Sequence, residues 1–254
     1  KEVSVHNKGN FPEQFGVYSY ENGYSRPLYV NWPWEDDTPS ATGWCDWPWF
    51  SAIEYKKPRD LVVRLVDLVA RNGGLLLSLN PRPDGTFDKG QEDLLIGMGN
   101  WLKQNGEAIY STVPWKIYAE GNTERLDYFE VGKNGQKGRA IQPDTSRLNE
   151  EDVRFTRNGE NLYATVLGVP DSGKVSIKSL AEKVSVSTDN EVKSVELLGH
   201  GLVKWTRDQK SLTIDLPKKL PNEWALSFKV NVVGELDKTQ PAVTSTKMKM
   251  PKQT

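Results

Sequence analysis

The chain has 254 residues, with 33 basic and 34 acidic side chains and a formal net charge of −1. This balance gives no general electrostatic reason to bind nucleic acid or an anionic membrane, so neither partner is expected. No apolar run approaches the roughly 20 residues of a membrane-spanning helix. A single cysteine, Cys45, excludes an internal disulfide framework, and two histidines are too few for an ordinary zinc centre.

The first 50 residues combine acidic side chains with five of the nine tryptophans. Glycoside hydrolysis uses such a combination, because two carboxyl groups act on the glycosidic bond while an aromatic face packs against the sugar. Solvated acidic loops and a tryptophan-rich core would give the same composition. No Walker loop, dinucleotide fingerprint, Gly-x-Ser-x-Gly or His-Glu-x-x-His motif is present.

Residues 59–110 have the pattern of a helix, a buried strand, a loop and a second helix. An apolar stripe at helical spacing predicts a helix over 59–72, which Asn72-Gly73 ends. The apolar run 75–79 predicts a parallel strand covered on both faces. After the turn at 81–85, a second helix is predicted from about Asp88 to Gly106. This order is typical of an α/β barrel or a doubly wound sheet, of which about 115 residues are present.

From about residue 125 the pattern changes to short alternating runs separated by turn residues such as Asn158-Gly159. Strands at this spacing predict an antiparallel β-sandwich. We therefore predict three regions, namely a barrel portion over 1–118, a sandwich over 119–234 and a flexible tail over 235–254. The expected strands cover residues 126–131, 153–156, 162–169, 175–179, 192–198, 202–206, 212–216 and 225–233.

Two stretches, 72–87 and 91–115, resemble the α-L-fucosidases of glycoside hydrolase family 29. The first contains Leu-Leu-Leu-Ser-Leu-Asn-Pro-Arg-Pro-Asp-Gly, and the second contains Trp-Leu-Lys-Gln-Asn-Gly-Glu-Ala-Ile-Tyr. A weaker likeness extends over the sandwich region. The resemblance implies an α/β plus all-β fold, the C-terminal portion of a (β/α)8-type barrel followed by an antiparallel β-sandwich. It further implies an exo-acting retaining hydrolase of terminal α-L-fucose on fucosylated glycans, without a cofactor, from a secreted or periplasmic and bacterial setting.

The resemblance also implies site residues, all near the N-terminus. Glu13 matches the general acid/base on a loop at the C-terminal face of the barrel, and Glu35, which follows Trp34, is a competing assignment. Lys8 stands where the family has an arginine beside the sugar. Trp44 matches a wall of the sugar pocket, although core packing remains an alternative, and Trp34 is a third substrate-binding candidate.

The family's aspartate nucleophile lies on an earlier strand and has no counterpart here. Asp46 lies beyond the expected acid/base position and does not replace it. We therefore expect a partner, the N-terminal half of the same enzyme, as a separate chain or a missing segment. Two alternatives remain open, a non-catalytic carbohydrate-binding or interaction fragment and a family member with altered sugar specificity.

Overall fold

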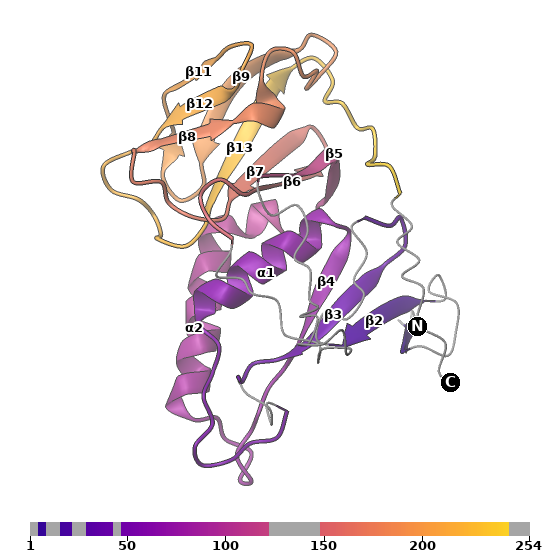
Figure 1. Ribbon diagram of the computed structural model, residues 1–254, viewed down its shortest axis with the longest axis vertical. Coiled ribbons are helices and arrows are strands. Elements are labelled where there is room, and N and C mark those ends of the chain that lie inside the picture. Colours follow the sequence, from indigo (N-terminus) through magenta and orange to yellow (C-terminus); the bar gives the residue numbers. More distant parts are fainter. Residues whose placement is uncertain (1–4, 9–15, 22–28, 43–46, 122–147, 244–254) are drawn as a thin grey trace, which may run out of the picture.

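The computed structural model describes residues 5–8, 16–21, 29–42, 47–121 and 148–243 (Figure 1). Glu13, Trp44 and the strand predicted at 126–131 lie outside these ranges. The described chain forms a parallel sheet with two helices, followed by two antiparallel sheets. The coarse prediction of an α/β part and then an all-β part is confirmed.

The parallel sheet has four strands in the order β1-β2-β3-β4. They are β1 (His6–Asn7), β2 (Val17–Glu21), β3 (Trp34–Pro39) and β4 (Gly73–Ser78). Helix α1 (Pro58–Ala70) connects β3 to β4, and α2 (Lys89–Asn105) follows β4 and leads into the short 3-10 helix η1 (Gly106–Ala108). Leu75 and Leu77 of β4 pack into the core shared with both helices. The helices therefore cover the same face of the sheet.

Local signals account for both helices. Pro58 occupies the first turn of α1, where its missing N–H is not needed, and Asn72 follows the helix with φ 68°. The Asp88 side chain accepts a hydrogen bond from the Gln91 backbone N–H and so caps α2. The two predicted helices are confirmed to within a few residues.

Strand β4 differs from its prediction on one face. Its side chains were expected to be covered on both sides, yet Leu76 is 45% exposed. Leu76 points away from α1 and α2, and no described helix packs on that face. An apolar side chain of this size in the middle of a strand indicates a face that is built to be covered.

The C-terminal half contains two antiparallel sheets. The larger sheet has the order β10-β9-β13-β7-β6-β5, and the smaller has the order β11-β12-β8. The strands are β5 (Val113–Glu120), β6 (Val153–Asn158), β7 (Asn161–Val166), β8 (Lys174–Ile177), β9 (Glu191–Leu197), β10 (Gly201–Leu202), β11 (Trp205–Arg207), β12 (Leu212–Asp215) and β13 (Leu226–Val233), with the 3-10 helix η3 (Lys178–Leu180) after β8.

One apolar core lies between these sheets. Phe155 and Phe228 of the larger sheet belong to the same buried cluster as Ile177 and Ile214 of the smaller sheet. The turn between β6 and β7 uses Gly159 at φ 57°, as the Asn-Gly signal predicts for a tight hairpin.

The predicted domain limits fall inside ordered structure. The limit at 118 lies within β5, which pairs with β6 and belongs to the larger sheet. Leu236, beyond the limit at 234, is 3% exposed in the core of the two sheets. The Trp115 indole N–H donates to the Asp237 carbonyl oxygen at 3.0 Å. These contacts extend the packed C-terminal half past residue 234.

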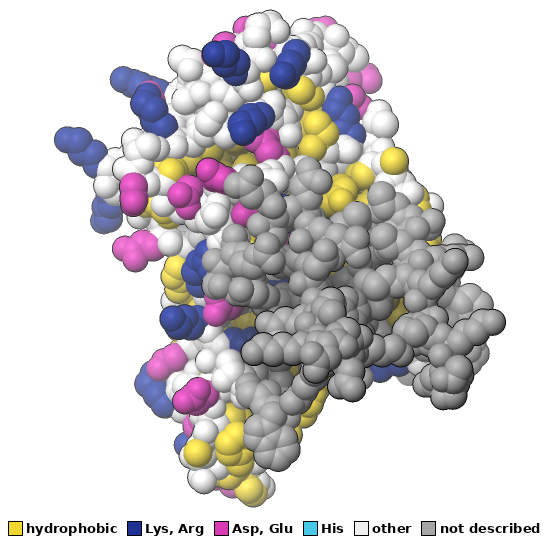
Figure 2. All heavy atoms as spheres, in the orientation of Figure 1, with side chains coloured by type: hydrophobic (Ala, Val, Ile, Leu, Met, Phe, Trp, Pro, Cys, Tyr) yellow, Lys and Arg dark blue, Asp and Glu magenta, His cyan; other side chains and the backbone are white. Residues whose placement is uncertain are grey.

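The two halves share a continuous interface. The Trp101 indole N–H of α2 donates to the Ala225 carbonyl oxygen at 3.0 Å, and Arg59 of α1 donates to the Leu148 carbonyl oxygen at 2.7 Å. Leu148 and Ala225 also join the buried core of the helices. Figure 2 shows acidic and basic side chains interspersed over the described part of one face, without a large patch of either sign.

Candidate active site

Strand β3 directs its side chains alternately to the two faces of the parallel sheet. On the face covered by α1, the Asp36 carboxylate lies 2.7 Å from Arg64 Nε, and the Trp34 indole N–H donates to the Arg71 carbonyl oxygen at 3.2 Å. Glu35 and Asp37 therefore share the opposite face, which Leu76 of β4 also reaches. The sequence Trp-Glu-Asp-Asp thus divides into two side chains that anchor the strand and two that line the open face.

Two nitrogen-bearing side chains, His6 of β1 and Lys8 just after it, reach these carboxylates. His6 Nδ1 lies 3.0 Å from Glu35 Oε1, and Lys8 Nζ lies 2.5 Å from Asp37 Oδ2. Strand β2 runs between β1 and β3, so the partners start about 10 Å apart, two strand spacings. Ser19 of β2 is the residue paired with Glu35, and its small side chain leaves room for the contacts to pass over it.

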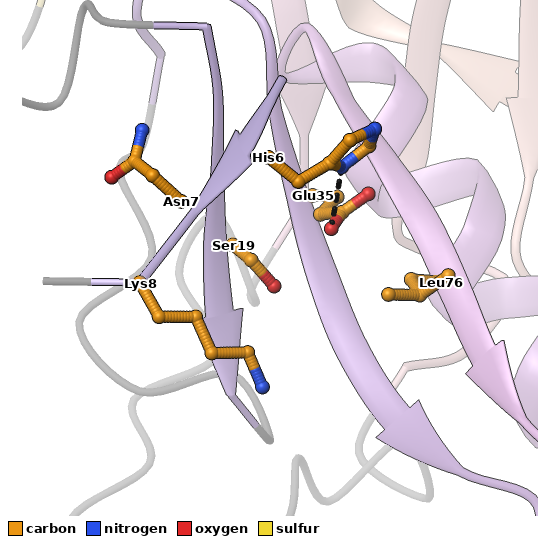
Figure 3. A pocket seen from close by; sticks show the side chains of 6 residues that line it. All are labelled: His6, Asn7, Lys8, Ser19, Glu35 and Leu76. Atoms are coloured by element: carbon orange, nitrogen blue, oxygen red, sulfur yellow. Dashed lines mark hydrogen bonds and ion pairs between the residues drawn. The ribbon is translucent and has the colours of Figure 1, made fainter. Parts of the chain in front are cut away.

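A cavity of about 350 Å³ lies on this open face. Its lining residues come from all four strands and the residue after β1: His6, Asn7, Lys8, Ser19, Glu35 and Leu76. Figure 3 shows His6 and Glu35 facing each other while the Asn7 side chain points away from them. Glu35 is only 7% exposed, so its carboxylate lies at the buried end of this cavity. One wall is apolar and the other carries both charge signs, which suits a polyhydroxylated ligand.

A buried polar network fixes the loops that follow β3 and β4. The Ser40 hydroxyl donates to Asn80 Oδ1 at 2.7 Å, and the Asn80 backbone N–H donates to Gln91 Oε1 at 3.1 Å. Asn80 Nδ2 then donates to the Trp47 carbonyl oxygen at 2.6 Å. Ser40, Asn80 and Gln91 are fully buried. The backbone at Trp47 is therefore held at the C-terminal edge of the sheet, where parallel α/β folds place their binding sites.

Asp88 adds a second anchor at this edge. Its carboxylate accepts hydrogen bonds from the Tyr55 hydroxyl at 2.8 Å and the Trp49 indole N–H at 3.3 Å. Burial by itself raises the pKa of Asp88, but the hydrogen bonds from Gln91, Tyr55 and Trp49 outweigh it and the net pKa is lowered. Burial, and then the hydrogen bond to Asp88 and its negative charge, raise the pKa of Tyr55 to about 12. Asp88 is thus held as a carboxylate that ties α2 to the loop.

The structure brings together two of the five predicted site residues. Lys8 and Glu35 both line the cavity on the open face. Trp34 lies on the other face, 2% exposed, with its ring 5.6 Å from that of Tyr20 in an edge-on contact. Its predicted contact with a sugar stays a prediction, and its described contacts are those of a core residue. Glu13 and Trp44 lie outside the described residues.

Three further residues were not among the five predicted site residues, although Glu21 and Asp37 belong to the acidic side chains of the first 50 residues. His6 and Asp37 complete the two charge pairs, and Glu21 is the last residue of β2, paired in register with Asp37. The signal for the pairs was present, because His6 and Lys8 are two residues apart, as are Glu35 and Asp37. A histidine and a lysine match two carboxylates at this spacing only once the two segments are recognised as neighbouring parts of one sheet.

Among the described residues, no three His, Cys, Asp or Glu side chains gather in the manner of a metal site. None of the described helices is long and apolar enough to cross a membrane.

Comparison with known proteins gives a consistent family. A family model described as alpha-L-fucosidase matches residues 2–107, and one described as the alpha-L-fucosidase C-terminal domain matches residues 142–231. The tissue alpha-L-fucosidase of Mus musculus is 26% identical over 226 residues, which cover 86% of this chain and 42% of the relative. The plasma alpha-L-fucosidase of Homo sapiens is 28% identical over 223 residues, which cover 85% of this chain and 41% of the relative. The chain thus spans less than half the length of these curated relatives.

Solved structures agree on the fold. The Thermotoga maritima alpha-fucosidase in complex with fucose matches with a TM-score of 0.63 at 23% identity, covering 89% of this chain and 44% of that one. An alpha-L-fucosidase isoenzyme from Paenibacillus thiaminolyticus matches with a TM-score of 0.59 at 21% identity. The match covers 85% of this chain and 45% of that one.

Proposed function

Because the chain belongs to the α-L-fucosidase family, we propose that it is the C-terminal part of an exo-acting retaining α-L-fucosidase that releases terminal α-L-fucose from glycans. The observation that carries this proposal is the set of paired charges on the open face of the parallel sheet. A sheet face that carries Glu35 and Asp37 beside an exposed Leu76 fits the interior of a barrel whose other strands lie outside this chain.

The pairs support a (β/α)8 arrangement through their geometry. In such barrels the inward side chains form layers, and each layer takes residues from alternate strands. His6 with Glu35 and Lys8 with Asp37 each join β1 to β3 across β2, as in layers that draw on alternate strands. The layer of Lys8 and Asp37 is nearer the C-terminal ends of the strands. We therefore assign the sugar-facing position to Lys8 and Asp37, and the two antiparallel sheets to the family's β-sandwich.

The acid/base assignment follows from how far each glutamate lies from the C-terminal ends of the strands. Glu35 lies four residues before the end of β3, about 13 Å along the strand, and its carboxylate is occupied by His6. Glu13 is in the segment directly after β1, and Glu21 is the last residue of β2. Catalytic groups of barrel enzymes come from strand ends and the loops after them. We therefore keep Glu13 as the proposed acid/base, with Glu21 as its competitor and Glu35 as a deeper support.

In the proposed reaction, an aspartate from the rest of the barrel attacks the anomeric carbon of fucose while the glutamic acid protonates the departing glycosidic oxygen. The resulting glutamate then takes a proton from water, which attacks the fucosyl-enzyme and releases fucose with its anomeric configuration retained. A non-catalytic glycan-binding role is the competing outcome. A secreted or periplasmic location and a bacterial source stay predictions.

Single Glu→Gln variants in the complete enzyme test the assignment. Glu13→Gln is expected to lower hydrolysis of a natural fucosyl disaccharide by roughly 10²–10⁴-fold, and to affect an aryl fucoside with an acidic leaving group much less. Added azide should restore turnover with the aryl substrate, because azide needs no general base. The matched control is Glu92→Gln on the exposed side of α2, which should leave both rates unchanged.

The outcome decides between the three glutamates. If Glu21→Gln shows the leaving-group dependence and azide rescue and Glu13→Gln does not, the acid/base is Glu21. If Glu35→Gln gives this result, Glu35 is the acid/base, and its assignment as a supporting residue deeper in the barrel is wrong. If none of the three variants changes hydrolysis, the proposed site is wrong.

A further inference from the structure

A groove lies between α2 and the segment that precedes β13, remote from the paired charges on the parallel sheet. Figure 1 places α2 on the far side of the molecule from β2. The groove has a volume of about 240 Å³. Its polar and aromatic lining comes from Asn100 and Gln104 of α2 and from Asn222, Glu223 and Trp224 of the preceding segment.

The aromatic wall of this groove is held in place. A Cβ at Gly97 would lie 3.3 Å from Cη2 of Trp224 and 2.8 Å from Cβ of Pro58, so glycine lets the indole lie close against α2. Asn222 Oδ1 accepts hydrogen bonds from the backbone N–H groups of Trp224 at 3.0 Å and Ala225 at 3.1 Å. The indole therefore lies close to α2 on a backbone that Asn222 holds in place, which lowers the entropic cost of binding.

The lining chemistry selects a class of ligand. An indole face packs against the C–H surface of a pyranose, and side-chain amides and a carboxylate pair with its hydroxyl groups. No Lys or Arg is among the described lining residues, and Glu223 contributes a negative charge. These features favour a neutral sugar over a sialylated, sulfated or phosphorylated one.

We propose that this groove is a second carbohydrate-binding site that holds one neutral sugar residue of a glycan. Its volume lies below the roughly 300–1,000 Å³ of pockets for drug-sized ligands, which fits a single pyranose in an open groove. The proposal goes beyond fucoside hydrolysis, because no residue of the paired-charge site contributes to the groove. Such a site would hold the enzyme on a glycan whose terminal residue is processed elsewhere.

The test is a titration of the isotope-labelled chain followed by amide and indole NMR signals. The probes are methyl α-L-fucoside, methyl β-D-galactoside and N-acetylneuraminic acid. A neutral sugar is expected to shift the signals of Trp224 and of the last two turns of α2. The double variant Asn100→Ala/Gln104→Ala should weaken binding about tenfold, through the loss of two exposed hydrogen-bonding groups. Gln209→Ala, in an exposed turn of the smaller sheet, is the matched control and should leave binding unchanged.

Three results would overturn the proposal: no shift at the highest soluble sugar concentration, equal affinity in the double variant and the control, or tighter binding of N-acetylneuraminic acid. Because Asn100 and Gln104 are exposed helix residues, the double variant is expected to fold. Aryl fucoside hydrolysis by the complete enzyme should be unchanged by it. The catalytic Glu→Gln variants should lose hydrolysis and keep sugar binding in the groove. The two proposals can therefore fail independently of each other.

Discussion

Replacing Asp67 by asparagine is expected to destabilise the junction between the two halves of the chain. The Asp67 carboxylate on α1 accepts hydrogen bonds from Arg71 Nη2 at 3.0 Å and from Arg154 Nε of β6 at 2.7 Å, both through Oδ1. All three side chains are at most 2% exposed. One buried carboxylate thus pairs with the guanidinium of the residue that caps α1 and with one from the antiparallel sheet.

The magnitude follows from the burial. Removing one partner of a buried ion pair typically costs about 3–5 kcal/mol, because the remaining charge loses its compensation in a medium of low dielectric constant. Asp67→Asn should lower the free energy of unfolding by that amount. A double-mutant cycle with Arg154→Met should give a coupling energy of about 1–3 kcal/mol. The assay is urea unfolding at neutral pH, followed by circular dichroism and tryptophan fluorescence.

A surface pair provides the matched control. Lys174 Nζ and Asp215 Oδ1 are 2.5 Å apart, but their side chains are 62% and 51% exposed. Solvent screens such a pair, so the cycle between Lys174→Met and Asp215→Asn should give a coupling close to zero. The reasoning is refuted if Asp67→Asn costs less than about 1 kcal/mol, or if the buried and exposed cycles give equal coupling.

Two further predictions concern α2 and the C-terminal segment. Gly99→Ala should stabilise the chain by about 0.5–1 kcal/mol through helix propensity, because no atom lies within 4 Å of the new Cβ. Gly97→Ala should instead lower the melting temperature, because its Cβ collides with Pro58. Equal melting temperatures of the two variants would contradict this prediction. Hydrogen bonds from Lys116 and then Thr239 lower the pKa of Asp237 to about 2, so its stabilisation is present above pH 4 and is lost as the pH falls towards 2. Asp237→Asn should therefore lower the free energy of unfolding by about 1 kcal/mol at pH 7 and by little at pH 2. Urea unfolding at both pH values measures this difference, and a loss independent of pH would refute the ion pair.

Much of the fold could be predicted because its signals are local. The stripe of leucines and valines in α1, the Asp88 cap of α2 and the Asn158-Gly159 turn each specify their own few residues. These signals act between neighbours in the sequence, so they do not depend on how the rest of the chain folds.

The site could be predicted only in part, because its pairs join residues far apart in the sequence. The sequence of β3 resembles an acidic loop. Its buried carboxylates Asp36 and Asp37 are tolerated because Arg64 and Lys8, 28 and 29 residues away, pair with them. The exposure of Leu76 was missed for the opposite reason. Its sequence fits a strand covered on both faces, and the described chain supplies the cover for one face.

The native mass and fucoside hydrolysis of the protein purified from its source, with every component chain identified, test the central claim most directly. We expect activity to accompany a species larger than 28.7 kDa, in which further polypeptide supplies an aspartate nucleophile against the open face of β1 to β4. A folded 28.7-kDa species that hydrolyses fucosides alone would contradict this account. So would a larger active species in which the open face stays exposed to solvent, as reported by hydrogen exchange at β3 and β4.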